Sequence, residues 1–102
     1  MKIRWDKTAK QQIEDIFRFN QTTFGTKKAI QIVQSINQHV SLLKQFPLMG
    51  TIEECTTARE VPYRYLVEKH CKIYYTVEAD FIYIALIWDT RQDPKKLFQY
   101  LE

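Results

Sequence analysis

The spacing of the apolar side chains changes in the middle of the chain, and this change decides the class of fold. Between residues 9 and 43 the apolar side chains recur every three or four positions, which places them on one face of a helix. From residue 59 onward the pattern changes to a period of two, which is typical of strands. Helices followed by strands predict an α+β domain, in which helices pack on an antiparallel sheet.

The first half of the chain predicts two antiparallel helices joined by a tight turn. Asp6 or Thr8 can cap the start of the first helix, and Gly25 ends it because glycine adopts the left-handed conformation without strain. Thr26 can cap the second helix, which stops at Pro47. The predicted core stripes are Ala9, Ile13, Ile16 and Phe17 in the first helix and Ala29, Ile32, Val33, Ile36, Val40 and Leu43 in the second.

The second half predicts three strands in an antiparallel meander. A short N-terminal strand over residues 2–5 is also expected, and residues 47–58 are expected to form a loop. The last strand is apolar on both faces, which predicts a central strand covered on both sides. The three strands are expected at 59–68, 71–78 and 81–88, with short turns near 69–70 and 79–80.

A short C-terminal helix is expected to complete the fold. Asp93 is a suitable cap, and Pro94 suits the first helical position because its missing N–H would be unpaired there anyway. Leu97, Phe98 and Leu101 are expected to dock this helix. The predicted architecture is an N-terminal strand, a helical hairpin on a meander of three to four strands, and the C-terminal helix, all in one domain over residues 1–102.

Composition excludes several classes of protein. No apolar run approaches the roughly 20 residues of a membrane span, and the start of the chain lacks a signal peptide, so we expect a cytoplasmic protein without a membrane partner. In that compartment Cys55 and Cys71 are expected to be reduced. Neither has a neighbour at zinc spacing, so no metal or cofactor is expected. The net charge is +3, which fits either a basic face for phosphate or a solvated surface.

Several motifs occur together along the chain. A Trp on the first strand and a hairpin broken at Gly25 precede FP-x-x-G (Phe46, Pro47 and Gly50), and Arg59 opens the sheet region. RYLVEKHCKIYYTVEADFIYI and DTRQDP (89–94) follow. In the order and spacing of these motifs the chain resembles the RelE/ParE superfamily of toxins from bacterial type II toxin–antitoxin modules, over nearly its whole length.

The resemblance implies one of two activities, because the superfamily uses one fold for both. RelE-like members are metal-free endonucleases that cut translated mRNA on the ribosome. ParE-like members inhibit DNA gyrase by binding, without catalysis. The basic residues at the family's positions favour the RelE-like endonuclease, and gyrase inhibition or a degenerate, inactive toxin are the alternatives.

RelE-like cleavage needs fixed cations around the phosphate, together with groups that move protons from the 2′-OH and to the leaving oxygen. The resemblance places Arg64, Lys72 and Arg91 at the family's basic positions, with Arg59 as a further cation. The family's C-terminal Tyr would fall near Leu97, and the chain offers Tyr100 one turn later. Each cation has an ordinary alternative as a surface residue, and Arg91 could pair with a flanking Asp.

The length of one turn tests this hypothesis. If the turn after the first meander strand has three residues, Arg64 and Lys72 share a face with Tyr74 and form a phosphate cradle, in which Arg59 and Tyr74 bind substrate. If it has two residues, Arg64 and Lys72 lie on opposite faces, which weakens the nuclease hypothesis.

The resemblance also implies a protein partner, an antitoxin that wraps around the toxin. Such a segment adds a strand to a sheet edge or lays an amphipathic helix into a groove. Trp5, Phe17 and Phe24 are candidate contacts where the chain itself leaves them uncovered, and basic surface would suit an acidic segment.

Overall fold

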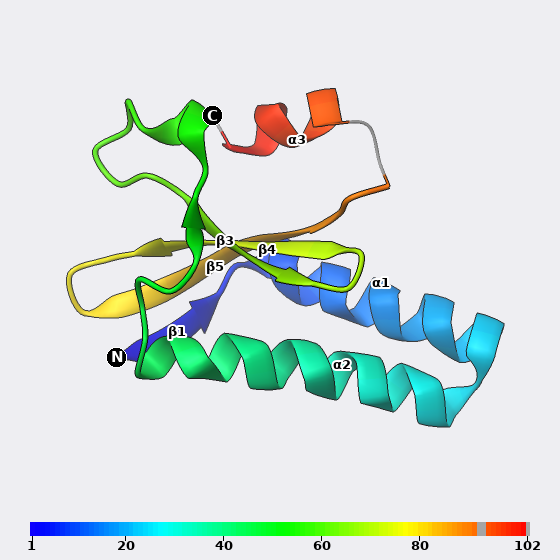
Figure 1. Cartoon of the computed structure of the whole chain (residues 1–102). Coiled ribbons are helices and arrows are strands. Elements are labelled where there is room, and N and C mark those ends of the chain that lie inside the picture. The colour runs from blue at the N-terminus through cyan, green and yellow to red at the C-terminus, as the bar shows by residue number, and fades with distance from the viewer. Residues whose placement is uncertain (92–93, 102) are drawn as a thin grey trace.

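The computed structural model describes residues 1–91 and 94–101, and these form a helical hairpin, a sheet and a C-terminal helix in three layers (Figure 1). The predicted α+β order is confirmed. The elements are β1 (Lys2–Trp5), α1 (Lys7–Phe24), α2 (Thr26–Ser41), the 3₁₀ turn η1 (Leu42–Lys44), β2 (Thr51–Ile52), the 3₁₀ turn η2 (Glu54–Thr56), β3 (Arg64–Glu68), β4 (Cys71–Val77), β5 (Phe81–Asp89) and α3 (Pro94–Leu101).

The hairpin is capped mostly as its sequence predicts. Asp6 is the N-cap of α1, and its carboxylate accepts a hydrogen bond from the Thr8 backbone N–H at 2.7 Å. Gly25, with φ 93°, both ends α1 and caps α2. The prediction that Thr26 caps α2 is therefore wrong: a single residue joins the two helices, so Thr26 is already helical. Its hydroxyl instead accepts a hydrogen bond from the Gln21 side chain at 3.2 Å.

The sheet is wider than the predicted meander. Its strand order is β1-β5-β4-β3-β2, in which β1 runs parallel to β5 and the other pairs are antiparallel. Part of the expected loop is a strand, because Thr51 and Ile52 pair with β3. The first meander strand begins at Arg64 instead of residue 59, since Pro62 has no N–H to donate to a neighbouring strand.

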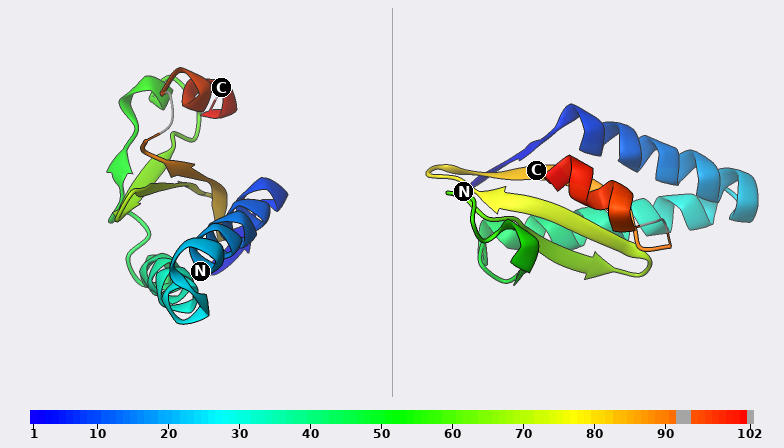
Figure 2. Two further views of the ribbon diagram at one scale, coloured as in Figure 1. Left: turned by 90° about the vertical axis from the view of Figure 1, so that its right-hand side faces the viewer. Right: turned by 90° about the horizontal axis from the view of Figure 1, so that it is seen from above.

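Cores on both faces of the sheet fix the layers, and Figure 2 shows the hairpin and α3 on opposite sides. Trp88 of β5 packs under α3 while Ile87 packs under the hairpin, so β5 is covered on both sides as predicted. Leu97 and Leu101 dock α3, but the prediction for Phe98 is wrong because this side chain is 43% exposed. The predicted α3 cap, Asp93, lies outside the described residues. The hairpin-side core is Ala9, Ile36, Val40, Leu43, Leu66, Ile73, Tyr75, Ile82, Ile84 and Ile87.

The lengths of the helices and the state of the two cysteines can be compared with the expectations from composition. No helix in residues 1–91 and 94–101 is long and apolar enough to cross a membrane. The thiols of Cys55 and Cys71 are both free.

Candidate functional site

The turn between β3 and β4 decides which predicted site residues share a face. It has two residues, Lys69 and His70, because Glu68 pairs with Cys71 across it. Lys69 has φ 54°, a left-handed conformation of the kind that two-residue hairpin turns require. Directly paired residues point to the same face, and successive residues alternate between faces. The two-residue alternative is therefore the one observed.

Arg64 and Lys72 consequently lie on opposite faces of the sheet. Arg64 pairs with Tyr75, whose side chain belongs to the hairpin-side core, whereas Lys72 pairs with Val67 on the α3 side. Three positions of β4 also separate Lys72 from Tyr75, roughly 10 Å along the strand. The geometry does not assemble Arg64 and Lys72 into one phosphate cradle.

The Arg64 side chain is used to hold a loop. Its Nη1 donates hydrogen bonds to the carbonyl oxygens of Leu48 at 3.2 Å and Gly50 at 2.9 Å. These carbonyls belong to the FP-x-x-G segment between η1 and β2, which has few backbone partners of its own. The guanidinium thus stabilises this segment against the sheet.

Lys72 belongs to an aromatic cluster on the α3 side. Its ammonium lies 4.4 Å from the ring centroid of Tyr65, and this ring contacts Tyr74 with a centroid distance of 5.6 Å. The Tyr74 hydroxyl donates a hydrogen bond to Glu53 at 3.0 Å. Burial, together with the neighbouring Glu53 carboxylate, raises the pKa of Tyr74. Tyr74 is fully buried, so its ring has no free face on which a base could stack.

Arg59 and Tyr100 both contact the α3 layer. The Arg59 Nη1 donates to the carbonyl of Leu101 at 3.4 Å, and its guanidinium lies 4.3 Å from the ring centroid of Tyr63. A cation at this end of α3 also complements the helix dipole. Tyr100 is 59% exposed, and its ring packs against Trp88 with a centroid distance of 6.2 Å.

Arg91 forms a two-pronged ion pair just beyond β5. Its Nε and Nη2 donate to the two carboxylate oxygens of Asp89 at 3.0 and 2.8 Å. The Arg91 hydrogen bonds hold the pKa of Asp89 below its ordinary value. This pair lines a groove beneath the hairpin, on the side of the sheet opposite Tyr100.

The predicted residues therefore fall into separate environments. Arg59, Lys72, Tyr74 and Tyr100 share the α3 side, whereas Arg64 and Arg91 contact different segments on the hairpin side. Within the part of the chain that the structure describes, no three His, Cys, Asp or Glu side chains are grouped to hold a metal ion. The arrangement offers aromatic surface with dispersed positive charge instead of a ring of cations around one point.

Two residues of the α3-side cluster, Glu53 and Trp88, were missed at the level of sequence, and Tyr63 was predicted only as a tyrosine that could stack on a base. The Glu53 carboxylate satisfies the Tyr74 hydroxyl, Tyr63 stacks on Arg59, and Trp88 supports Tyr100. Strand alternation gives the side on which Trp88 lies only after the turn length is known, and Glu53 lies in the segment expected to be a loop. Placing these residues together requires the register between neighbouring strands, which the sequence alone does not give.

The known proteins that this chain resembles have the same fold and belong to the family that the motifs indicate. The fold and its motifs define a toxin of the RelE/ParE superfamily. Residues 3–94 match the family model of the ParE toxin of the type II toxin–antitoxin system parDE, so the chain belongs to the ParE toxin family. A search of curated proteins gives no significant match.

One similar solved structure is described as the chromosomal ParDE TA system from P. aeruginosa. The TM-score is 0.73 and the sequence identity is 22%, with 89% of this chain and 97% of that chain covered. At this identity the similarity shows a common fold.

Proposed function

We propose that this ParE-family toxin acts by binding DNA gyrase and not by cutting mRNA, and that a cognate antitoxin neutralises it in the cytoplasm. The observation that carries the proposal is the two-residue turn, because it puts Arg64 and Lys72 on opposite faces of the sheet. The ParE family match supports the same choice.

The chemistry of RNA cleavage explains why the placement of the cations matters. Attack by the 2′-OH builds negative charge on one phosphate, which several cations must stabilise together. Here Arg64 donates to loop carbonyls, and Arg91 is paired with Asp89. Tyr100, the Tyr that the resemblance offers for proton transfer, lies on the α3 side, away from both. Inhibition by binding requires a surface complementary to gyrase, and it does not require cations or a proton-transfer group placed around one phosphate.

A plasmid supercoiling assay with purified gyrase tests the proposal. We expect the purified toxin to block supercoiling in a concentration-dependent manner, and we expect primer extension on total mRNA after induction to show no new cuts. Full gyrase activity at a large excess of folded toxin would contradict the proposal.

The nuclease alternative predicts a different result in the primer-extension assay. It requires mRNA cuts that disappear in Lys72→Ala and Arg91→Ala, two variants at exposed or half-exposed side chains that leave both cores intact. Arg64→Ala is a poor choice for this test because it also releases the loop that Arg64 holds. Cuts that depend on Lys72 and Arg91 would overturn the gyrase proposal.

A further inference from the structure

The helical hairpin is longer than the sheet that it covers. Figure 1 shows the Gly25 end of α1 and α2 extending past the turn between β3 and β4, and the two views of Figure 2 agree. A groove of about 700 Å³ lies between this end of the hairpin and the ends of β3, β4 and β5. Along α1 the lining runs from Gln12 to Phe24, so the middle of the groove is near Phe19.

The apolar lining of the groove has no covering layer. Ile16 and Ile32 pack partly against the hairpin-side core, whereas Phe19 and Phe24 are 58% and 63% exposed. Large apolar side chains grouped at one surface mark an interaction site more often than scattered ones do. Trp5, by contrast, packs on the core and is not part of this surface.

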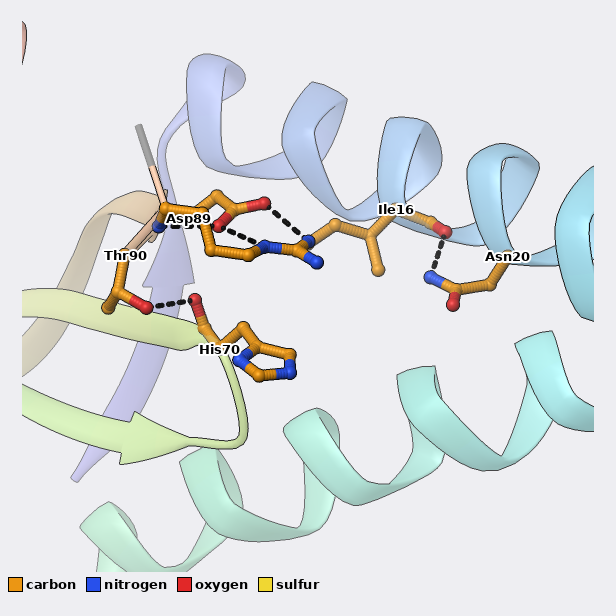
Figure 3. Close-up of polar contacts among 6 residues, drawn as sticks. Ile16, Asn20, His70, Asp89 and Thr90 are labelled. Atoms are coloured by element: carbon orange, nitrogen blue, oxygen red, sulfur yellow. Dashed lines mark hydrogen bonds and ion pairs between the residues drawn. The ribbon is translucent and has the colours of Figure 1, made fainter. Parts of the chain in front are cut away.

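The wall of the groove at the sheet is well tied together. The carbonyl oxygen of His70 accepts hydrogen bonds from the backbone N–H and the hydroxyl of Thr90, at 2.8 and 3.0 Å, and these join the turn after β3 to the end of β5. Figure 3 shows His70, Asp89 and Thr90 at this edge, facing Ile16 and Asn20 of α1. A partner in the groove therefore meets a fixed wall at the sheet end and the open end of the hairpin at the other.

The two ends of the groove differ in charge. Five of the six charged side chains that line it are at the sheet end, two bases against three acids, and the sixth is a lysine near the open end. The five are Asp15, Glu68, Lys69, Asp89 and Arg91, and the sixth is Lys28. The sheet end is therefore net negative and the open end is positive.

Two of these charges have no counter-charge in the same chain. The others are offset locally, by the ion pair of Asp89 with Arg91 and by the neighbouring carboxylate and ammonium at positions 68 and 69. Asp15 and Lys28 each lie beyond ion-pair distance of an opposite charge among residues 1–91 and 94–101. Asp15 accepts a hydrogen bond from the Gln11 side chain at 3.0 Å.

A two-fold axis brings these two charges together. Asp15 lies ten residues before Gly25 and Lys28 lies three residues after it, so their levels along the antiparallel hairpin differ by seven residues, about 10 Å. An axis midway between the levels passes beside Phe19, near the middle of the groove. It turns Asp15 of one copy toward Lys28 of the other, and the reverse contact forms as well because both copies use the same patch.

A second copy of the chain also fits the shape of the groove. The hairpin end of the second copy is as long as the uncovered space on the first, because the two chains are identical. Its Phe19 and Phe24 would cover the same two side chains of the first copy, so apolar surface is buried on both. A partner with charge of a single sign would be repelled at one end of the groove.

We infer that two copies of this chain associate through the groove, with their hairpin ends antiparallel, Phe19 and Phe24 at the centre, and Asp15 of each copy near Lys28 of the other. The inference concerns the free toxin and does not depend on the proposed function. The shared surface is limited to the ends of the two hairpins, so we expect a weak dimer, with a dissociation constant of about 1–100 μM.

Paired aromatic substitutions test the apolar contact. Sedimentation equilibrium of the full chain, from about 1 to 500 μM, measures the dissociation constant, and a reducing agent prevents disulfides of the free Cys55 and Cys71. We expect the wild type to become dimeric across this range and Phe19→Ser with Phe24→Ser to weaken the dimer about tenfold or more. Phe46→Ser is the matched control, because Phe46 is 57% exposed but lies outside the groove, and it should dimerise like the wild type.

A charge exchange tests the orientation of the two copies. Asp15→Lys and Lys28→Glu should each weaken the dimer, because each places like charges at both contacts of the pair. An equimolar mixture of the two variants should restore it, because both contacts of the mixed dimer then join opposite charges. Lys10→Glu is the control, at an exposed position of α1 that does not line the groove, and it should dimerise like the wild type.

Three results would overturn the inference. A wild-type chain that is monomeric at about 500 μM would leave the groove to a different partner. A Phe19→Ser, Phe24→Ser variant that dimerises within about twofold of the wild type would place the dimer contact elsewhere. A mixture of the charge variants that stays as weak as each variant alone would exclude the two-fold arrangement. If the aromatic variant does not fold by circular dichroism, the charge exchange decides, since Asp15 and Lys28 are both exposed.

Discussion

At the scale of single residues, the FP-x-x-G motif is explained by one tyrosine. The Tyr75 hydroxyl donates to the carbonyl of Pro47 and accepts from the backbone N–H of Gly50, both at 2.9 Å. A Cβ on Gly50 would lie 2.5 Å from the same hydroxyl oxygen. Glycine is therefore required here by close approach. Burial raises the pKa of Tyr75, so the hydroxyl keeps its proton for this bond.

Gly50→Ala should destabilise the fold for this reason. The added methyl group must displace the buried Tyr75 ring or the loop, at a cost of about 1–3 kcal/mol. The free energy of unfolding in urea measures the change. Thr51→Ala, one position later at an exposed site, serves as control and should stay within about 0.5 kcal/mol of the wild type. An unchanged midpoint for Gly50→Ala would show that the contact is not tight.

The types of the elements were predictable from sequence because each has a clear apolar period. The helical stripes through Ala9 and Ile36 and the alternation in β4 and β5 are local properties. The positions of the site residues were not predictable to the same degree. One residue more or less in the 69–70 turn moves Lys72 to the other face, and β2 is only two residues long. Arg64 was expected near phosphate, but its hydrogen bonds go to carbonyls that are distant in sequence.

At the scale of elements, α2 and β3 are joined by a polar contact beside the hairpin-side core. Glu68 accepts hydrogen bonds from Ser35 at 2.7 Å and contacts the His39 Nδ1 at 2.8 Å. The Ser35 hydrogen bond, with the nearby His39, holds the pKa of Glu68 below its ordinary value. A carboxylate with a lowered pKa stabilises the fold above its unfolded pKa, about 4.3 for Glu, and this stabilisation is lost as the pH falls through the folded pKa.

Ser35→Ala should therefore lower stability in a pH-dependent way. We expect a loss of about 1 kcal/mol at pH 7, which shrinks as the pH falls below about 4 and Glu68 becomes protonated in both proteins. Urea unfolding across this pH range measures it. Ser41→Ala is the control, because the Ser41 hydroxyl bonds to the Asn37 carbonyl and to no carboxylate. A Ser35→Ala loss that is equal at every pH would argue against the Glu68 explanation.

The docking of α3 depends on two leucines. Leu101 is 2% exposed and packs with Trp88 in the α3-side core. We expect Leu101→Ala to destabilise the chain by about 2–5 kcal/mol and to shift the fluorescence of Trp88 toward that of a solvated indole. Gln99→Ala, at an exposed position of the same helix, should do neither. Equal effects of the two substitutions would mean that α3 is not held by this face.

At the scale of the whole molecule, the layers give a gradient of protection. Strands β4 and β5 have a neighbouring strand on each side and a core on both faces. The end of the hairpin near Gly25 extends beyond the sheet, so no strand lies beneath it (Figure 1). Local opening costs little free energy where few buried contacts are lost. The end of the hairpin that packs on the sheet is therefore the stable end, and the end near Gly25 is the solvent-accessible one.

Amide hydrogen exchange should resolve this gradient within one helix. We expect the amides of residues 19–24 in α1 to exchange faster than those of residues 10–16, which belong to the same helix but lie over β5, and those of β5 to exchange slowest. Uniform exchange along α1 would contradict this prediction, because it would mean that the Gly25 end of the hairpin is as well protected as the part of α1 that lies over β5.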